Sequence, residues 1–162
     1  MHLFNPNDCI KISEGAKIQT PQEVRQYLTW LSEPGLPLHM SEITISAPDK
    51  SAKGQMIQAI ITRNLYRLWF SGEKVMGITW WNTVDGCGKR NEPSISGILT
   101  RDMKEKPAYQ ALDELINKEW KTSVEVQPDK DGNISWRGFK GKYRITWISP
   151  KGKEMTEEFV LK

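Results

Sequence analysis

LPLHMSEITI, residues 36–45, is a mostly apolar, β-rich run of about the length of a buried strand. A second apolar run, VMGITWW, occupies residues 75–81. Between them, residues 52–70 carry apolar side chains at helical spacing and end before Gly72. Strand, helix and strand in this order predict a right-handed βαβ unit, in which the two strands are parallel members of one sheet.

The flanking segments extend this alternation. His2-Leu3-Phe4 is apolar and is interpreted as the end of a strand, which the turn-rich residues 5–8 close. Residues 20–33 predict a helix, because Thr20-Pro21-Gln22-Glu23 has the pattern of a capping box with proline in the first turn. Pro107 begins a third helix. Apolar strands separated by amphipathic helices predict an α/β fold with a parallel sheet buried on both sides.

The pattern changes after Trp120. Short alternating runs, separated by turns that contain glycine, predict a small antiparallel β tail with one buried face. We therefore predict two domains, residues 1–120 and residues 121–162. The strands expected in the tail are residues 123–126, 133–139, 142–148 and 155–161.

The size of the first domain bears on its architecture. A parallel sheet with only about three βα units exposes both edge strands and much apolar surface. A closed (β/α)8 barrel needs about 250 residues. Because the chain begins inside a predicted strand, we favour a partial (β/α)8 TIM barrel, whose N-terminal half lies outside these 162 residues, over an unusual small sheet.

Charge and hydropathy argue against two classes of partner. The net charge is only +3, and Lys and Arg form no compact stripe interleaved with aromatic residues, so we expect no nucleic-acid partner. No apolar run approaches the roughly 18 residues of a membrane helix. The first residues lack a charged region followed by an apolar one, so they do not form a signal peptide.

No motif for a cofactor or a metal is present, and we expect neither. Asp85-Gly86-Cys87-Gly88 lacks the Lys-Ser/Thr pair of a phosphate-binding loop, and no serine stands in a nucleophile elbow. Cys9 and Cys87 fit no zinc-ligand spacing. A disulfide between these two cysteines stays open at this point.

Glu42 is the first candidate for chemistry. It lies near the carboxyl end of an otherwise apolar strand, the end that faces the active site in a barrel. A buried carboxylate is costly unless it is bonded or functional, so the alternatives are catalysis and a bond to a neighbouring group. Trp80 and Trp81 end the next strand, where an indole can stack on a sugar; one of the two is expected to point into the helix layer. His2 and His39, taken alone, are more typical of structural histidines.

Several stretches resemble the xylan-degrading glycoside hydrolases of family 10. LPLHMSEITI is similar to the family's strand-seven motif, and GITWWNTVD, residues 77–85, to its strand-eight motif. Gly97-Ile98-Leu99 followed by KPAYQAL, residues 106–112, resembles the entry into the last barrel helix. Met1-His2-Leu3 is similar to the tail of the strand-six motif. The order and spacing agree across residues 1–120, and residues 119–139 resemble a β-rich tail found on some members.

The resemblance implies a retaining β-1,4-xylanase that uses no cofactor and acts on xylan or xylo-oligosaccharides. Glu42 matches the nucleophile, and His2 matches the imidazole that orients it. Trp81 matches the tryptophan at the floor of the glycone subsites. Trp80, Asn82 and Asp85 are expected to line the substrate site beside it. The full-length protein is expected to be secreted or held at the cell surface.

Three departures from the family pattern qualify this expectation. Thr44 stands where the family often has Asp, and residues 85–93 lack the second subsite tryptophan. No residue corresponds to the acid/base Glu of strand four. We therefore expect a C-terminal portion of a xylanase that carries the nucleophile without the acid/base and is inactive alone. The alternatives are a non-catalytic polysaccharide-binding module and a self-associating half-barrel protein.

Overall fold

A computed structural model describes residues 2–161, with side chains from residue 5 onward, and shows two compact units. The division falls between Leu115 and Ile116, slightly before the boundary predicted at Lys121. Each unit has its own sheet, and the two sheets share no strand. Among the described residues, no helix has the length and apolar character needed to cross a membrane.

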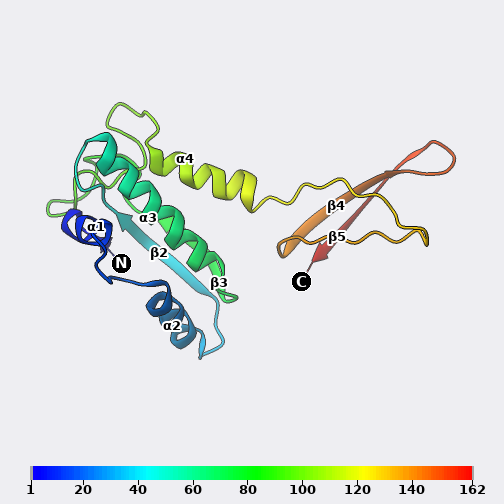
Figure 1. The fold of residues 1–162 in the computed structure, drawn as a ribbon, viewed down its shortest axis with the longest axis horizontal. Helices are drawn as coiled ribbons and strands as arrows, with labels where there is room; N and C mark the ends of the chain where they lie inside the picture. The colour runs from blue at the N-terminus through cyan, green and yellow to red at the C-terminus, as the bar shows by residue number, and fades with distance from the viewer. Residues whose placement is uncertain (1, 162) are drawn as a thin grey trace. The chain divides into compact units, whose positions relative to one another are not determined.

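The sheet of the first unit confirms the predicted parallel arrangement (Figure 1). It contains β1 (His2–Phe4), β2 (Leu38–Ile45) and β3 (Val75–Trp80), in the order β1-β2-β3. Thr44 of β2 pairs with His2, and Ile43 pairs with Trp80. Because β2 is central, the strand that carries Glu42 has a hydrogen-bonded neighbour on each side.

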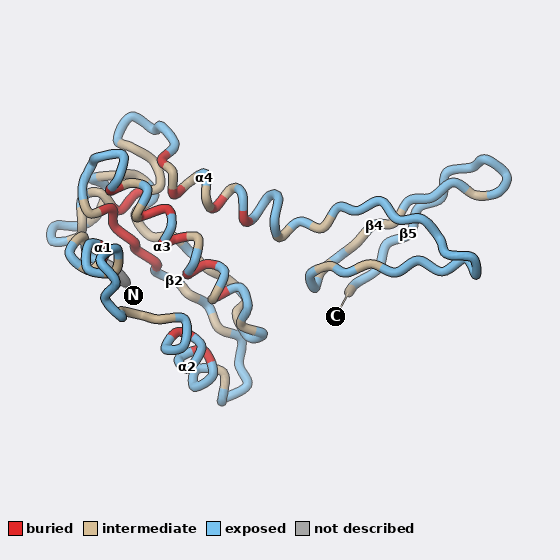
Figure 2. Tube along the Cα trace, viewed as in Figure 1, coloured by how far each residue is buried: buried red, intermediate tan, exposed pale blue. Residues whose placement is uncertain are grey.

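Helices α2 (Pro21–Ser32), α3 (Ala52–Phe70) and α4 (Pro107–Glu114) confirm the three predicted helices. The capping box at Thr20 is formed, since the Glu23 amide donates to Thr20 Oγ1 and the Glu23 carboxylate accepts from the Thr20 amide. α4 continues into a π-helical turn, Leu115–Glu119. Figure 2 shows buried segments on β2, α2, α3 and α4. The core includes Leu28, Ile43, Ile45, Leu65, Tyr66, Trp69, Leu112 and Leu115.

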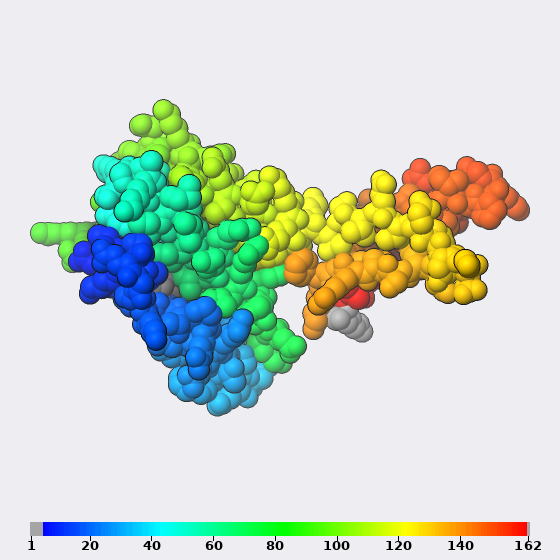
Figure 3. Space-filling view, in the orientation of Figure 1, coloured from blue at the N-terminus to red at the C-terminus, as the bar shows by residue number. Residues whose placement is uncertain are grey.

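The first helix, α1 (Pro6–Ser13), corrects the prediction of a turn at residues 5–8. The Asn5 side chain accepts from the amide of Asp8 at 3.0 Å and caps the helix, and Pro6 occupies its first turn. Asn, Pro and Asp favour both turns and helix starts, so composition alone could not separate the two. Buried Cys9 then holds α1 against the sheet, where its thiol donates to the Ser46 carbonyl at 3.0 Å. In Figure 3 the atoms of α1 and α2 border those of α3.

The second unit contains one antiparallel hairpin, β4 (Gly141–Ile148) and β5 (Glu154–Leu161), with Tyr143 opposite Phe159. The strands predicted at residues 123–126 and 133–139 are wrong, because neither segment forms regular structure. Trp136 packs its ring on Tyr143 at 4.7 Å between ring centroids, so an aromatic contact rather than backbone pairing joins residues 133–139 to the hairpin.

Both cysteines are free thiols, and they differ in burial. Cys9 is fully buried, and burial, with a smaller contribution from Asp8, raises the pKa of its thiol to about 12. Cys87 is exposed. We expect a thiol reagent to label Cys87 alone in the native protein, because a three-unit rise in pKa cuts the thiolate fraction about a thousandfold. Mass spectrometry of labelled Cys87→Ser would show no native adduct and one adduct in urea; equal labelling rates at the two native thiols would contradict this.

Candidate active site

Glu42 lies at an irregularity in the register of β2. Met40 and Ile43 are three residues apart on β2, whereas their partners on β3, Ile78 and Trp80, are two apart. β2 therefore contains an extra residue at Ser41–Glu42, and a bulge of this kind re-aims a side chain. The residues that follow, Ile43–Ala47, are buried, but Glu42 is exposed. The strand end is thus anchored in the core while its carboxylate stays accessible.

Trp81 is held next to this strand end by a backbone bond. Its amide donates to the Ile43 carbonyl at 2.7 Å, and its side chain is half-buried. Asn82 follows with a φ of 60°, a left-handed conformation that asparagine tolerates better than most residues. Its amide Nδ2 donates to Glu92 Oε2 at 2.7 Å, and the same oxygen accepts from the Lys89 amide at 2.9 Å. Asn82 is therefore tied into the loop that follows β3.

Trp80 lies on the helix side of the sheet. Its ring is stacked with Tyr66 of α3, at 6.3 Å and 29°, and its indole N–H donates to the Ser96 carbonyl at 3.1 Å. Successive residues of a strand point to opposite faces, so only one of the two tryptophans could face the helix layer. The structure places Trp80 there, away from the substrate-lining position predicted for it, and leaves Trp81 for the open face.

Asp85 is one half of a buried ion pair. Its Oδ1 lies 3.0 Å from the ammonium of Lys106, with side-chain exposures of 17% for Asp85 and 2% for Lys106. The same Oδ1 accepts from the Gly97 amide at 2.8 Å. Burial lowers the pKa of Lys106 below its usual value, and the hydrogen bond and charge of Asp85 oppose that shift. These bonds favour a positioning role for Asp85 over direct contact with substrate.

Lys106 joins three parts of the first unit, and we call its surroundings the Lys106 junction (Gln58, Asp85, Ile95, Gly97 and Lys106). The ammonium also donates to the carbonyls of Gly97, at 2.8 Å, and Ile95, at 3.5 Å. Gln58 Nε2 donates to the Gly97 carbonyl and to the Ile45 carbonyl at the end of β2. The junction therefore fixes the loop after β3 against the strand that carries Glu42.

Sequence reasoning missed Gln58 and Lys106. A lysine before a helix-starting proline has the appearance of an ordinary surface residue, and only its partners allow it to be buried. The signal was the family resemblance: Asp85, Gly97 and Lys106 all belong to motifs that carry it, but the motifs do not show that these residues meet. A side chain at Gly97 would collide with the backbone of Val84 and Asp85, so the close approach requires glycine there.

Of the two histidines, only His39 has a side chain among the described residues. The side chain of His2 lies outside the described residues, and only its backbone pairing with Thr44 is known. His39 is exposed, and its Nε2 lies 2.8 Å from Thr79 Oγ1 on the neighbouring strand. The predicted orienting role of His2 therefore stays a prediction.

Comparison with known proteins gives a family match. The model of the family described as glycosyl hydrolase family 10 matches residues 6–115. The anti-sigma-I factor RsgI6 of Acetivibrio thermocellus is 32% identical over 124 residues, which cover 76% of this chain and 15% of that protein. Endo-1,4-beta-xylanase 2 of Arabidopsis thaliana is 25% identical over 135 residues, covering 82% of this chain and 12% of that protein.

A solved structure shares the fold of the first unit. The intracellular xylanase TsXylA of Thermoanaerobacterium saccharolyticum, solved with xylotetraose, superimposes with a TM-score of 0.51 at 17% identity. The match covers 57% of this chain and 29% of that one, and it shows the fold alone. The chain thus spans only a small part of the length of the proteins it resembles. The two sequence matches are longer than the first unit, so they reach into the second.

Proposed function

Because this chain belongs to glycosyl hydrolase family 10, we propose that its first unit supplies strands six to eight, with their helices, of a (β/α)8 barrel that hydrolyses β-1,4-xylosidic bonds with retention. The observation that carries the proposal is the placement of Glu42 at the β2 bulge. There an accessible carboxylate extends from a strand end that the core and Trp81 hold in place.

Retention needs two displacements at the anomeric carbon. In the first, a Glu42 carboxylate oxygen attacks that carbon while the bond to the glycosidic oxygen breaks, and a second carboxylic acid protonates the leaving oxygen. In the second, water attacks the same carbon, gives its proton to that second carboxylate, and Glu42 leaves. Trp81 would stack on the sugar in the glycone subsite. The Lys106 junction would act at a distance, by fixing the loop that begins at Trp81.

We propose that the second carboxylic acid comes from barrel strands outside these 162 residues. Glu33 and Glu73 precede β2 and β3 and so lie at the amino ends of these strands, whereas Glu42 lies near the carboxyl end of β2. Neither can reach a bond held at the carboxyl ends of the strands. The 162-residue chain alone is therefore expected to lack hydrolytic activity, since general acid help contributes about 100- to 10,000-fold. Because xylan is a polymer outside cells, we also propose that the whole protein is secreted or displayed on the surface, which fractionation of the producing cells tests.

A chimeric barrel tests the proposal. The first five βα units of an active family 10 xylanase would be joined in frame to residues 1–115, and xylo-oligosaccharide hydrolysis followed by NMR of the released anomer. We expect the chimera to release the β-anomer first and the 162-residue chain alone to release none. Inversion would contradict the proposal, as would an inactive chimera that folds and binds xylo-oligosaccharide.

Polysaccharide binding without hydrolysis is the second candidate function. The observation in its favour is the 32% identity to a protein named as an anti-sigma factor rather than as a hydrolase. The chimera separates the two candidates, because a binding protein would retain affinity for xylo-oligosaccharides without releasing product.

A further inference from the structure

The second unit contains a concentrated run of positive charge. Between Gly132 and Lys153 there is no Asp or Glu, while the basic residues are Arg137, Lys140, Lys142, Arg144, Lys151 and Lys153. Four of these six lie in WRGFKGKYR, residues 136–144, where they alternate with aromatic residues and glycine. Basic and aromatic residues therefore are interleaved in this segment, which corrects the prediction that the chain has no such stripe; the small net charge of +3 does not reveal it.

Aromatic packing fixes the shape of this segment. The Trp136 ring lies 4.7 Å from that of Tyr143 and 6.1 Å from that of Phe159, measured between centroids. The Tyr143 hydroxyl donates to the Phe139 carbonyl at 2.6 Å, which leaves it to accept from the Thr122 hydroxyl at 3.1 Å. A side chain at Gly138 would collide with the Trp136 ring and the Tyr143 hydroxyl, so the backbone passes directly over them.

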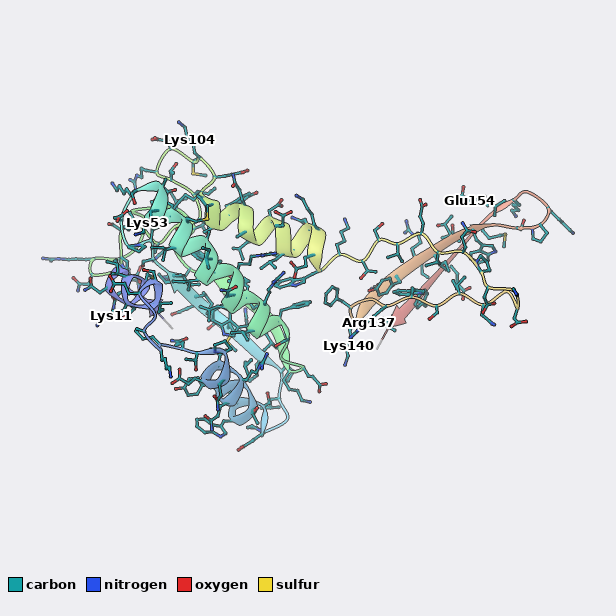
Figure 4. All side chains as sticks on the ribbon, viewed as in Figure 1. Lys11, Lys53, Lys104, Arg137, Lys140 and Glu154 are labelled. Carbon is teal, nitrogen blue, oxygen red and sulfur yellow. The ribbon has the colours of Figure 1, made fainter. Side chains whose placement is uncertain are left out.

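This packing leaves the cations on the surface. Arg144 pairs with Glu158 across the hairpin at 2.7 Å. Arg137 and Lys140 are exposed, and among the described residues neither has an ion-pair partner. Figure 4 shows both at the same end of β4, whereas Glu154 lies at the other end of the hairpin. Phe139, between them in sequence, is 40% exposed. We call Arg137, Phe139 and Lys140 the Arg137 surface.

We propose that the Arg137 surface binds a polysaccharide that carries uronic-acid groups. Arg137 and Lys140 would pair with sugar carboxylates, and Phe139 would cover the apolar face of a pyranose ring. The choice of a sugar polymer rests on the proposed function of the first unit. The anchoring by Tyr143 lowers the ordering cost of binding, because the loop is already held in one shape.

The density of charge favours a polysaccharide over a nucleic acid. A duplex carries one phosphate charge per ~1.7 Å of its axis, and its binding affinity rises with the number of phosphates that a basic surface neutralises. The Arg137 surface offers two cations beside one apolar ring, and exposed Lys142 adds one more next to it. That composition fits a polymer in which single carboxylates are separated by neutral sugars with apolar faces.

Isothermal titration of the 162-residue chain with glucuronoxylan tests the proposal. The reference polymer is the same xylan with its carboxyl groups reduced to alcohols. We expect binding to glucuronoxylan and weaker binding to the reduced polymer, by about 2- to 25-fold for two ion pairs, since an exposed ion pair contributes about 1.4- to fivefold each. Raising the salt from about 0.05 M to about 0.5 M should weaken binding to glucuronoxylan and leave binding to the reduced polymer unchanged.

Two double variants with equal loss of charge locate the site. Arg137→Gln/Lys140→Gln should bind glucuronoxylan about tenfold more weakly, by the same ion-pair arithmetic. Lys151→Gln/Lys153→Gln removes the same charge from the turn at the other end of β4 and should bind within about twofold of the parent. Near-UV circular dichroism would check that both variants keep the aromatic packing, and the salt titration of the parent chain stands if one does not.

Four results would overturn the proposal: absence of binding, equal binding to both polymers, equal loss in both double variants, or binding to a DNA oligonucleotide as tight as to glucuronoxylan. Lys53→Gln, which removes an exposed charge from α3 of the first unit, is expected to leave this binding unchanged. If the Arg137 surface does not bind glucuronoxylan, the hydrolysis proposal is therefore unaffected. If the chimera is inactive, the glucuronoxylan titration still tests the Arg137 surface.

Discussion

Glu42→Ala in an active chimera is expected to lower kcat by about 10⁴- to 10⁶-fold, the range found when a nucleophile or its partners are removed from an enzyme that forms a covalent intermediate. The reason is that Glu42 would supply the oxygen that attacks the anomeric carbon in the first displacement, and alanine has none. Glu42 is the carboxylate that the β2 bulge leaves exposed at this edge, and its neighbours Ile43 and Thr44 are buried.

The measurement is initial rate against aryl xylobiosides, followed by mass spectrometry after reaction with a 2-fluoro xyloside that traps the covalent intermediate. The adduct is expected on the peptide that contains Glu42. Glu73→Gln is the matched control, because it removes the same kind of carboxylate from the opposite edge of the sheet. An adduct on another residue would show that Glu42 is not the nucleophile, and so would more than about 1% residual activity in Glu42→Ala, since a lost nucleophile costs far more.

Lys106→Met is expected to reduce the free energy of unfolding by about 3–5 kcal/mol, because removing one partner of a buried pair leaves the other charge without compensation. Asp85 would keep the Gly97 amide but lose its cation, and the carbonyls of Ile95 and Gly97 would lose a donor. Methionine keeps much of the volume of the lysine side chain, so the effect reports the polar contacts rather than a cavity.

Urea unfolding followed by far-UV circular dichroism measures this loss, because the described α-helices all lie in the first unit. Lys53→Met, at an exposed position of α3, is the control and should change the free energy of unfolding by less than about 0.5 kcal/mol. In a double-mutant cycle, Asp85→Asn should cost less in the Lys106→Met background than in the parent. Additive effects would mean that the two residues do not stabilise each other.

The elements that could be predicted from the sequence are those in which apolar residues form a regular pattern over a long segment. The 19 residues of α3 and the central strand β2 have one dominant pattern, and tertiary packing agrees with it. Residues 133–139 also alternate, yet they form no strand, and Trp136 instead packs its ring on Tyr143. The pattern of one segment does not show whether it will pair as a strand or pack against a distant segment, because the two meet only in the folded chain.

The residues of the candidate site likewise fall into those that could be predicted from the sequence and those that could not. The position of Glu42 at the end of a strand could be predicted, since it depends on one strand and its direction. The strand pattern alone could not distinguish Trp80 from Trp81, because a shift of one residue in register exchanges the faces of a strand. Only the family resemblance singled out Trp81. Lys106 could not be predicted at all: its burial depends on an aspartate and two carbonyls that reach it from elsewhere in the chain.

The anchoring of the loop after β3 has a consequence for how its specificity can change. Asp85 at one end and Ile95 and Gly97 at the other are bound to the same ammonium, and the Gly86 amide donates to the Ser94 carbonyl at 2.8 Å just inside them. Residues 87–93 therefore project from a closed base. Under the proposed function, a change in their length or composition would alter any contact of the loop with sugar while the carboxylate on β2 keeps its place.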